Sequence, residues 1–566
     1  MSLFGSIQMA GNTLQAMQIG LHVVGNNIAN ANTPGYVRER VMYTPAPVMK
    51  LGDLTLGLGV EIAGIVQNID SFVEQRLRDT GADRASADVQ SSAYRELESI
   101  LGELSDTDVS TSLTGFFNSL DEIVNQPEEM SVRNLAVQAG KALVSTINTL
   151  GRRVTTIYEE FAHGVADLTS EINSLAEQIR KLNLQIVSLE GGDATANQAG
   201  GLRSQRNLAL KRLTEIAGVE ASENPVGAVT VSLGGELLVF EGTRREVLAE
   251  YSAQRGLTTA QIVFADNGSV LQPTRGELHG LYEARDAVVG GFITRLDQFA
   301  ATLANEFNKV YSQGQGATGY TSVTSHVAVD DPAAALDAAG LPFTPVNGEF
   351  KLLLYNASTK LQQTHRIKVD LDGLQDDSTL ASLAAEIDGI AGVAAEVTAD
   401  GRLKLSAESA ETRLAFADDS SGLLAAMGVN TFFTGSTATD LAINEVVAQD
   451  GSKFAASAAG AIGVDVRNAQ RLVALHDQGL ASLDGGSITG IYDTLINETA
   501  QGGAVAESIA DGFKVFEETL LAQAESVSGV NLDEEAIDMI QLQRTYQASA
   551  KYVATLAELL DVLVNL

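Results

Sequence analysis

The chain has 566 residues, of which 45% are hydrophobic and 19% charged, and its formal net charge at pH 7 is −35. A nucleic acid partner is disfavoured because phosphates carry charge of the same sign. The absence of cysteine excludes disulfides, thiol nucleophiles and thiolate metal sites. No apolar run is long enough for a membrane-spanning helix, and the N-terminus lacks the basic and apolar segments of a cleaved secretory signal. The length predicts several domains of roughly 100 to 200 residues each.

The N-terminal segment predicts an amphipathic helix without charges. Its first 37 residues contain no Lys, Arg, Asp or Glu. Apolar residues alternate steps of four and three, which is a heptad seam: Leu3, Ile7, Ala10, Leu14, Met17, Leu21, Val24 and Ile28. Because the back of this helix is also uncharged, we expect it to be buried among neighbours. Gly5, Gly11, Gly20 and Gly25 each weaken a helix by about 0.8 to 1 kcal/mol relative to Ala, so the arm should be helical only when packed.

The C-terminal segment predicts a second helix with a seam of its own. The seam comprises Met539, Leu542, Tyr546, Ser549, Val553, Leu556, Leu560 and Leu563. Arg544, Lys551 and Glu558 lie at the position farthest from this seam. Asn531 followed by Glu534 resembles a capping box, and the acidic residues after it suit the start of a helix dipole.

Between these ends the pattern alternates between helices and strands. Residues 86–215 predict long helices, whose apolar stripe slips by one residue after Phe161 and so indicates a stutter or a bend. Residues 226–275 alternate as strands, with a hairpin at Gly234 and Gly235, and a helix resumes near Ala284. Residues 320–435 predict further strands, a short helix at 380–387 and a hairpin at Asp400 and Gly401. From about residue 455 the pattern is helical again.

This order predicts an α+β multidomain fold with paired, coiled-coil-like terminal helices, a discontinuous helical-bundle body and inserted β-rich modules. The expected segments are an N-terminal axial helix arm with a turn (1–45), a connector and the first part of the helical body (46–225), a small β-rich module (226–280), the second part of the helical body (281–319), an inserted β-rich module (320–435), the return of the helical body (436–528) and a C-terminal axial helix arm (529–566).

The turn after the first helix, residues 25–40, carries the most specific motif. Its general interpretation is a helix stop, because Asn side chains satisfy terminal backbone groups and Pro34 with Gly35 favours a turn. The string also resembles the signature of the axial proteins of the bacterial flagellum, in which Asn-Asn-Ile-Ala-Asn leads into Asn-x-Thr-x-Gly-aromatic. The matching residues are Asn26, Asn27, Ile28, Ala29, Asn30, Asn32, Thr33, Gly35 and Tyr36.

Within the axial proteins, the chain is most similar to a hook-associated family whose turn reads Thr-Pro-Gly-Tyr followed by an Arg. Thr33, Pro34, Gly35, Tyr36 and Arg38 match it, whereas hook and rod proteins more often have Thr-Gly-Phe-Lys. Residues 56–65, 296–308 and 530–553 are similar to the same family. The likeness covers the ends well and the middle poorly.

The resemblance implies a structural subunit that is first at the junction between hook and filament and acts there as a mechanical adaptor. The partners it implies are hook protein, a second hook–filament junction protein, a ring of identical copies, the flagellar type III export apparatus and an export chaperone at the C-terminal helix. The implied location is outside the cell, in the flagellum. No cofactor, metal or membrane is implied.

Three alternatives stay open at this point. For an enzyme, the six histidines form no HExxH pair and no G-x-S-x-G elbow occurs, although the many carboxylates leave acid–base chemistry open. Asp370 to Gly373 resembles the start of a calcium loop, but the remaining ligand spacing fails and a turn fits better. A secreted coiled-coil adhesin or effector would also be acidic and free of cysteine, but it would not need two matched terminal seams around a signature turn. Another axial protein of hook or rod type is the third alternative.

Overall fold

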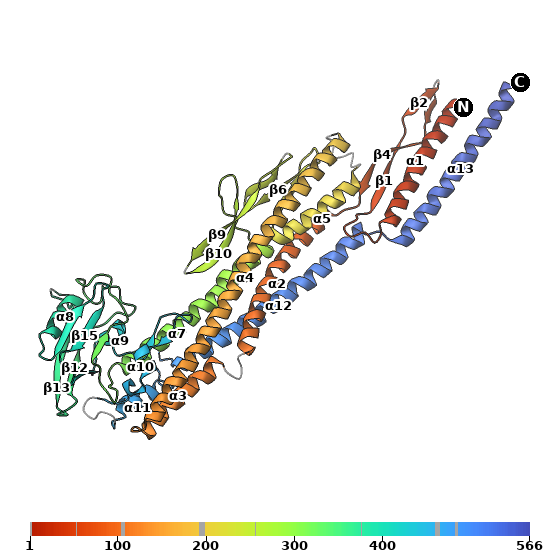
Figure 1. Cartoon of the computed structure of the whole chain (residues 1–566). Coiled ribbons are helices and arrows are strands. Elements are labelled where there is room, and N and C mark those ends of the chain that lie inside the picture. The colour runs from red at the N-terminus through yellow and green to blue at the C-terminus, as the bar shows by residue number, and fades with distance from the viewer. Residues whose placement is uncertain are drawn as a thin grey trace. The chain divides into compact units, whose positions relative to one another are not determined.

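The computed structural model describes residues 3–51, 54–103, 108–191, 199–240, 242–254, 256–374, 376–458, 464–480 and 485–565. It confirms an α+β multidomain fold of long helices with small antiparallel sheets (Figure 1). The chain divides into two compact units. The first comprises Met1–Ala93, Tyr158–Val288 and Gly503–Leu566, and the second comprises Tyr94–Ile157 and Val289–Gly502.

Four helices cross from one unit to the other along the chain: α2 (Ser71–Glu103), α4 (Met130–Glu190), the π-helix η1 (Ala284–Val289) and α12 (Ile488–Ser528). The other elements of the first unit are α1 (Leu3–Ala29), β1 (Glu39–Pro45), β2 (Val48–Leu51), β3 (Leu54–Gly57), β4 (Val60–Gln67), α5 (Gly200–Ala217), β5 (Glu220–Glu223), β6 (Val229–Leu233), β7 (Glu236–Phe240), β8 (Thr243–Arg244), β9 (Val247–Gln254), β10 (Leu257–Phe264), α6 (Glu277–Glu283) and α13 (Leu532–Val564).

The other elements of the second unit are α3 (Val109–Asn125), α7 (Gly290–Tyr311), β11 (Ser322–Thr324), β12 (Gly348–Asn356), β13 (Gln362–Val369), α8 (Leu380–Asp388), β14 (Val393–Val397), β15 (Leu403–Ala407), β16 (Thr412–Ala417), α9 (Leu423–Met427), β17 (Phe433–Thr434), β18 (Ala442–Ile443), α10 (Glu445–Gln449), the 3₁₀-helix η2 (Gly451–Lys453) and α11 (Arg467–Ala474).

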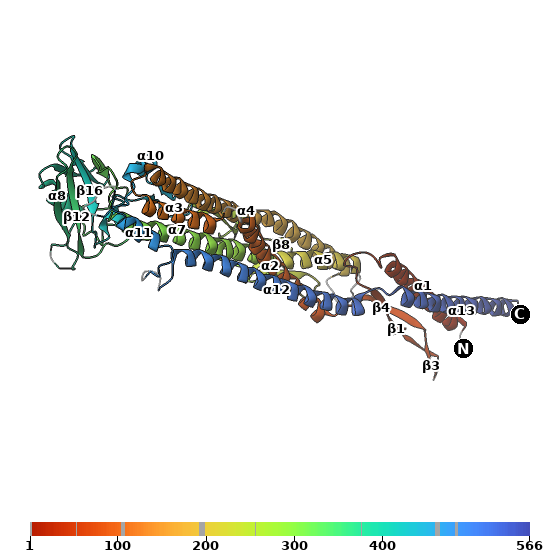
Figure 2. The ribbon, with the colours of Figure 1, turned by 90° about the horizontal axis from the view of Figure 1, so that it is seen from below.

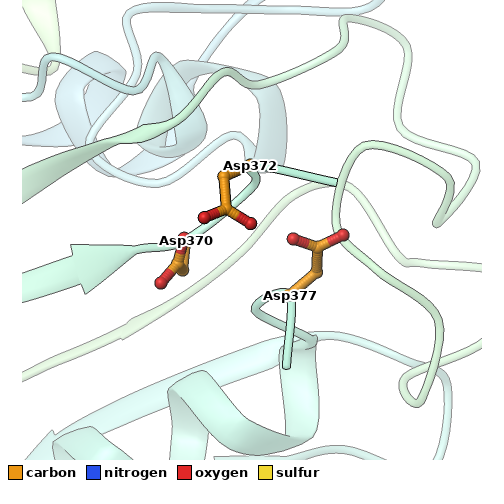
Figure 3. A group of neighbouring side chains, drawn as sticks. All are labelled: Asp370, Asp372 and Asp377. Atoms are coloured by element: carbon orange, nitrogen blue, oxygen red, sulfur yellow. The ribbon is translucent and has the colours of Figure 1, made fainter. Parts of the chain in front are cut away.

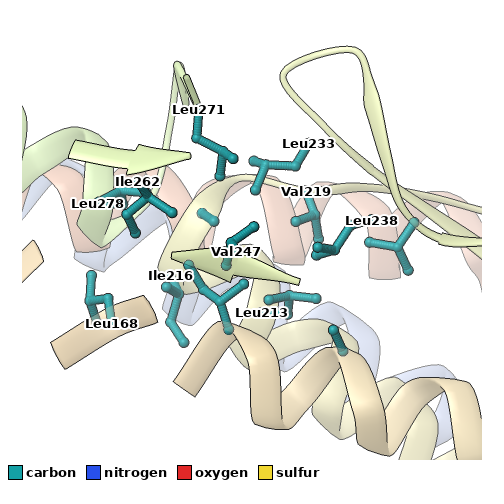
Figure 4. Close-up of a cluster of buried hydrophobic side chains, with 14 of the residues drawn as sticks. Leu168, Leu213, Ile216, Val219, Leu233, Leu238, Val247, Ile262, Leu271 and Leu278 are labelled. Carbon is teal, nitrogen blue, oxygen red and sulfur yellow. The ribbon is translucent and has the colours of Figure 1, made fainter. Parts of the chain in front are cut away.

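The main core of the first unit lies between the helices and the strands of residues 219–271 (Figure 4). Ile172 and Ile179 of α4 and Leu213 of α5 are fully buried there, as is Val231 of β6. Ile172 and Ile179 are seven residues apart, as the sequence pattern predicts for one face of a helix. Val231 lies on the buried side of an alternating strand, which the pattern also predicts. The Gly234–Gly235 hairpin is confirmed, since Leu233 pairs with Glu236 in adjacent antiparallel strands.

The second unit contains a β-rich module and an aromatic helical core. The sheets β13-β12-β16 and β11-β15-β14 enclose a core with α8, and β14 pairs with β15 around the predicted Asp400–Gly401 turn. The aromatic core joins Phe116 of α3 and Phe307 of α7 to Phe432 and Phe433, with ring centroids 4.9 to 5.8 Å apart. The phenylalanines at 432 and 433 therefore belong to the helical core, although they lie inside the segment predicted as 320–435.

The slip in α4 and the segment after the signature turn show details that the sequence pattern left open. The helix α4 continues without interruption through the one-residue slip, and the buried position moves by one residue from Ile157 to Tyr158 and Ala162, so the slip is a stutter. Residues 39–67, which the predicted boundary at residue 45 divides between the N-terminal arm and the connector, contain two strand pairs, β1 with β4 and β2 with β3. Among the described residues, no helix is both long and apolar enough to cross a membrane.

Candidate assembly site

The terminal helices α1 and α13 lie side by side in both views, and both chain ends are at the same end of the pair (Figures 1 and 2). Asn27 of α1 contacts Glu535 of α13, and Gly20, seven residues earlier, faces Leu542, seven residues later. Moving seven residues back along α1 corresponds to moving seven residues forward along α13. The two helices are therefore antiparallel, and their contacts repeat every seven residues.

The pair brings the predicted seams together but covers them incompletely. In α1, Ala10, Met17 and Val24 are buried, and Ile7, Leu14, Leu21 and Ile28 are half-buried. In α13, Leu556 is buried, Met539, Leu542, Val553 and Leu560 are half-buried, and Tyr546 is 38% exposed. The side chains of Leu3 and Leu563 lie outside the described residues. Arg544, Lys551 and Glu558 are exposed, at the position that the spacing predicts for them.

Two glycines allow close packing at this pair. A Cβ on Gly20 would lie 2.5 Å from the Tyr43 hydroxyl and 3.2 Å from Leu542, so a larger residue would displace side chains of both β1 and α13. Gly59 has φ of +88°, and a Cβ there would lie 2.9 Å from the Met9 carbonyl oxygen. The helix-weakening glycine at position 20 thus has a packing role.

The signature turn is a series of short hydrogen-bonded turns at the end of α1. The Asn30 amide nitrogen donates to the Asn26 carbonyl at 3.1 Å, Thr33 to Asn30 at 2.9 Å and Tyr36 to Thr33 at 3.1 Å. Gly35 has φ of +74°, a conformation that favours glycine. Ala29, Thr33, Pro34 and Gly35 are exposed, whereas Asn26, Asn30 and Tyr36 are half-buried and Asn27 is buried.

Asn27 connects the turn to both neighbouring elements. Its side-chain oxygen accepts hydrogen bonds from the Tyr36 hydroxyl at 2.9 Å and from the Glu39 backbone nitrogen at 3.0 Å. Its side-chain nitrogen donates to the Glu39 carbonyl at 2.9 Å and to the Glu535 carboxylate at 3.0 Å. All of the hydrogen-bonding capacity that a buried Asn needs is met here, so this residue fixes the turn to β1 and to α13 at once.

Arg38 completes the connection to α13. Its Nε donates to the Glu535 carboxylate at 2.7 Å, and its Nη1 lies 3.0 Å from the more exposed Glu534 carboxylate. The Arg38 backbone nitrogen also donates to the Ser528 carbonyl at the end of α12, at 3.0 Å. Only 1% of the Glu535 side chain is exposed, so its charge depends on Arg38 and Asn27 for compensation. We call Asn27, Tyr36, Arg38, Glu39 and Glu535 the clasp.

Burial at the clasp shifts the ionisation of its neighbours. Desolvation raises the pKa of the Tyr36 hydroxyl, and the nearby Glu39 and Glu535 carboxylates raise it further. Desolvation also raises the pKa of the Glu39 carboxyl. The pKa of Tyr43 is raised by burial and then by Asp538. Both tyrosines therefore stay protonated and can donate hydrogen bonds at neutral pH.

A groove with a volume of about 980 Å³ adjoins the clasp. It lies between the signature turn, the connection from α12 to α13, and side chains such as Leu208 of α5 and Leu77 of α2. Its lining mixes polar and apolar groups and includes the carboxylates of Glu74, Glu525 and Glu534.

The acidic turn of the second unit brings three carboxylates together (Figure 3). Oxygens of Asp370, Asp372 and Asp377 lie within 4.8 Å of one another. The Lys368 ammonium contacts Asp370, the Leu374 amide donates to Asp372 at 3.0 Å, and the Gly373 amide donates to Asp377 at 3.2 Å. These local hydrogen bonds are those of the turn that the sequence favours over a calcium loop.

The sequence interpretation missed Glu535, the central carboxylate of the clasp. Its acidic run was assigned to the helix dipole, and a capping box was expected between Asn531 and Glu534. The structure corrects this: the Asn531 side chain accepts from the Asp533 amide at 3.0 Å, and Glu534 pairs with Arg38. The missed signal is that Glu535 precedes Leu542 by seven residues and so occupies a seam position, where a charge needs a partner.

Comparisons with known proteins agree with this arrangement. Residues 7–36 match the family described as flagella basal body rod protein, and residues 522–566 match the C-terminal part of flagellar basal body rod FlgEFG proteins. Residues 94–324 match the helical domain of flagellar hook-associated protein FlgK. Both ends of the chain thus match models of flagellar rod proteins, and the helical body matches a model of a flagellar hook-associated protein.

Proteins that match this chain along its whole length indicate more closely which flagellar protein it resembles. Flagellar hook-associated protein 1 of Salmonella typhimurium is 26% identical over 99% of both chains, and that of Bacillus subtilis is 24% identical over 100% of this chain and 98% of its own. The chain is thus similar to flagellar hook-associated protein 1 along its whole length, and its helical body matches the model of that protein's helical domain. The solved structure of the flagellar hook junction protein FlgK from Burkholderia pseudomallei has a similar fold, with a TM-score of 0.52 and 15% identity over 80% of this chain and 100% of that one.

Proposed function

We propose that this chain is the structural subunit that joins the flagellar hook to the filament, as the first junction protein on the hook. The observation that carries the proposal is the clasp, which uses the signature turn to hold the N- and C-terminal helices together as one antiparallel arm. The full-length similarity to flagellar hook-associated protein 1 supports the same role.

The arm has surface left for contacts with other subunits. On α13 the outward face displays apolar side chains that are 38 to 64% exposed: Ile537, Ile540, Tyr552, Leu559 and Val562. The exposed face of α1 carries no Asp, Glu, Lys or Arg and includes Phe4, Gln8, Gly11, Gln15, Gln18 and His22. A helix with apolar groups on both faces is stable in water only when both are covered. Identical copies placed around an axis would cover them, and the half-buried seam residues complete that packing.

The same surfaces suit contacts with neighbouring assembly components. Hook protein on one side and the second junction protein on the other would continue the packing of the terminal helices. Export through the flagellar type III apparatus, a chaperone on the C-terminal helix and a location outside the cell follow from the family resemblance. The role is mechanical and non-enzymatic, since specific packing performs it without chemistry, cofactor or metal.

Immunoelectron microscopy of purified flagella tests the proposal. Antibody against this chain should label a narrow band between hook and filament, and deletion of the gene should leave hooks without filaments. Label along the rod or the hook would instead support another axial protein. Label elsewhere on the cell surface would support an adhesin.

A further inference from the structure

The exposed residues of α12 in the first unit lie on two different flanks of the helix. One flank carries exposed charged residues: Glu507, Asp511, Lys514, Glu518 and Glu525. The other has no charge, and its residues follow steps of four, three, four, seven and four along the helix: Val505, Ile509, Gly512, Phe516, Gln523 and Val527. An exposed stripe with heptad spacing is the pattern expected for a helix that packs against a partner. We call the second stripe the uncharged flank.

The uncharged flank is extended by aromatic and cationic side chains of α2. The Arg76 guanidinium lies 5.6 Å from the Phe72 ring and 5.5 Å from the Phe516 ring. Phe72 is 66% exposed and Phe516 is 41% exposed. Arg76 forms no ion pair within the described part of the chain. Exposed aromatic rings around an arginine are typical of the residues that dominate protein–protein interfaces.

A small cavity continues this surface beside Ile509. It has a volume of about 280 Å³ and lies between α2, α6 and α12. Phe513 and Ile509 form its apolar side, and Arg275 and His279 lie on its polar side. Such a recess can receive one side chain from a partner, as a hole receives a knob in helix packing.

Gly512 gives an independent indication of a close neighbour. A glycine in a helix interior costs about 0.8 to 1 kcal/mol relative to alanine, so its presence needs a reason. For Gly280 the reason lies inside the chain, because a Cβ there would be 2.7 Å from the Ser86 carbonyl oxygen. At Gly512 a Cβ would meet nothing within 4 Å. A second chain that packs closely on this flank accounts for the missing side chain.

We propose that the uncharged flank, together with Phe72 and Arg76, docks a second copy of this chain. The inference rests on the proposed function, because α12 leads within three residues into α13, whose packing between copies that function requires. Copies aligned through α13 bring α12 helices alongside one another. The charged flank then supplies carboxylates such as Asp511 and Glu518 to Arg76 of the neighbour. Two unlike flanks on one helix make a head-to-tail contact, the kind that closes identical subunits into a ring.

Site-specific photo-crosslinking in purified flagella tests this. A photoreactive phenylalanine analogue at Ile509 should yield a product with twice the mass of the chain, and the same analogue at Ser508, between the flanks, should yield much less. A crosslink to a different flagellar protein, or none while the chain is present in the flagella, would overturn the docking proposal. If immunoblots show that even the unsubstituted chain is missing from flagella, the proposed function itself fails.

A charge substitution gives a second test, which is needed if the photoreactive phenylalanine analogue prevents export of the chain. Arg76→Asp should reduce the amount of chain that urea-washed flagella retain by about tenfold, as expected for one interface anchor. Lys181→Asp makes the same change of charge on exposed α4 and should leave retention unchanged. Circular dichroism of both purified variants checks that they fold. Equal retention of the two folded variants would contradict the docking surface.

Discussion

At the residue scale, Glu535 carries the connection between the two ends of the chain. Its carboxylate is 1% exposed and contacts Arg38 and Asn27. Glu535→Ala removes the hydrogen bonds that this carboxylate accepts from Arg38 and Asn27, and a hydrogen bond to a charged group contributes about 1.5 to 3 kcal/mol. We predict that Glu535→Ala strongly lowers the fraction of the chain retained in flagella at increasing urea concentration, and that it impairs swimming.

The neighbouring carboxylate provides a matched control. The Glu534 side chain is 58% exposed and contacts the same arginine. An exposed pair contributes only about 0 to 1 kcal/mol, so Glu534→Ala should behave nearly like the parent protein. Similar urea profiles for the two variants would show that the clasp does not hold the arm together.

The clasp also shows how far residues can be interpreted from sequence. The signature string located the turn, and Asn27, Tyr36 and Arg38 were identified through it. Glu535 was not, because an acidic residue in the first turn of a helix already has a sufficient explanation in the helix dipole. Its role depends on a contact across 497 residues of chain, which local pattern does not encode.

At the element scale, the inner face of α13 should decide incorporation. Leu556 is 7% exposed and Leu560 is half-buried, whereas Lys551 is exposed. Burying a leucine side chain contributes about 1.5 to 3 kcal/mol, and aspartate would place charge in the same contact. We predict that the double variant Leu556→Asp, Leu560→Asp is secreted as monomer and builds no filaments.

The outward face supplies the comparison for this test. Lys551→Gln removes one exposed charge and should leave swimming normal. Filament counts by electron microscopy and immunoblots of the culture medium measure both variants. Filaments on the leucine variant, or their loss in the lysine variant, would require the faces of the helix to be reassigned.

The β-rich module of the second unit should be removable if the cut spares the aromatic core. Its own core runs from Tyr320 to Val429, whereas Phe432 and Phe433 pack with Phe307. We predict that replacing residues 320–429 by a short Gly-Ser linker leaves export and incorporation intact, since lengthening a loop costs only about 0.6 kcal/mol per doubling.

A longer deletion, which begins at the same residue but extends to Gly435, is the comparison for this variant. It removes both phenylalanines and should unfold the helical part of the second unit, because losing a buried aromatic side chain costs about 3 to 5 kcal/mol. Circular dichroism and incorporation into flagella distinguish the two deletions. Failure of the shorter deletion to assemble would show that the module takes part in assembly.

Elements with strong local signals were predicted well, and those that depend on tertiary contacts were not. The hairpin at Gly234–Gly235 and the helix at 380–388 have turn and capping residues of their own. The strands β1 and β4 pair across a second hairpin, and no strand was predicted for either of them. Local pattern also does not tell which core a phenylalanine joins: Phe432 and Phe433 lie inside the predicted segment 320–435, and their rings pack with Phe307 of α7.

At the scale of the whole molecule, the two ends of the chain form one functional element. Every charged residue of the arm lies after position 37, and the net charge of −35 keeps free copies apart in solution. Attraction between copies must then come from exposed apolar side chains, such as those of α13, and from the uncharged flank of α12. Assembly is favoured only where several of these surfaces are covered together.

The last prediction follows from how little apolar surface α1 and α13 bury against each other in a single chain. In the described part of α13, Leu556 is the only apolar side chain that is buried, and α1 contains four interior glycines. Such a pair gains too little from burial to offset the entropy of ordering two long helices. We predict rapid hydrogen exchange across 3–29 and 532–564 in a dilute monomer, and strong protection of both segments in isolated flagella. The core strands around Val231 serve as the internal reference and should be protected in both states. Protection of the arms in the dilute monomer equal to that of the core would show that the arm is stable before assembly, and that packing between copies is not what orders it.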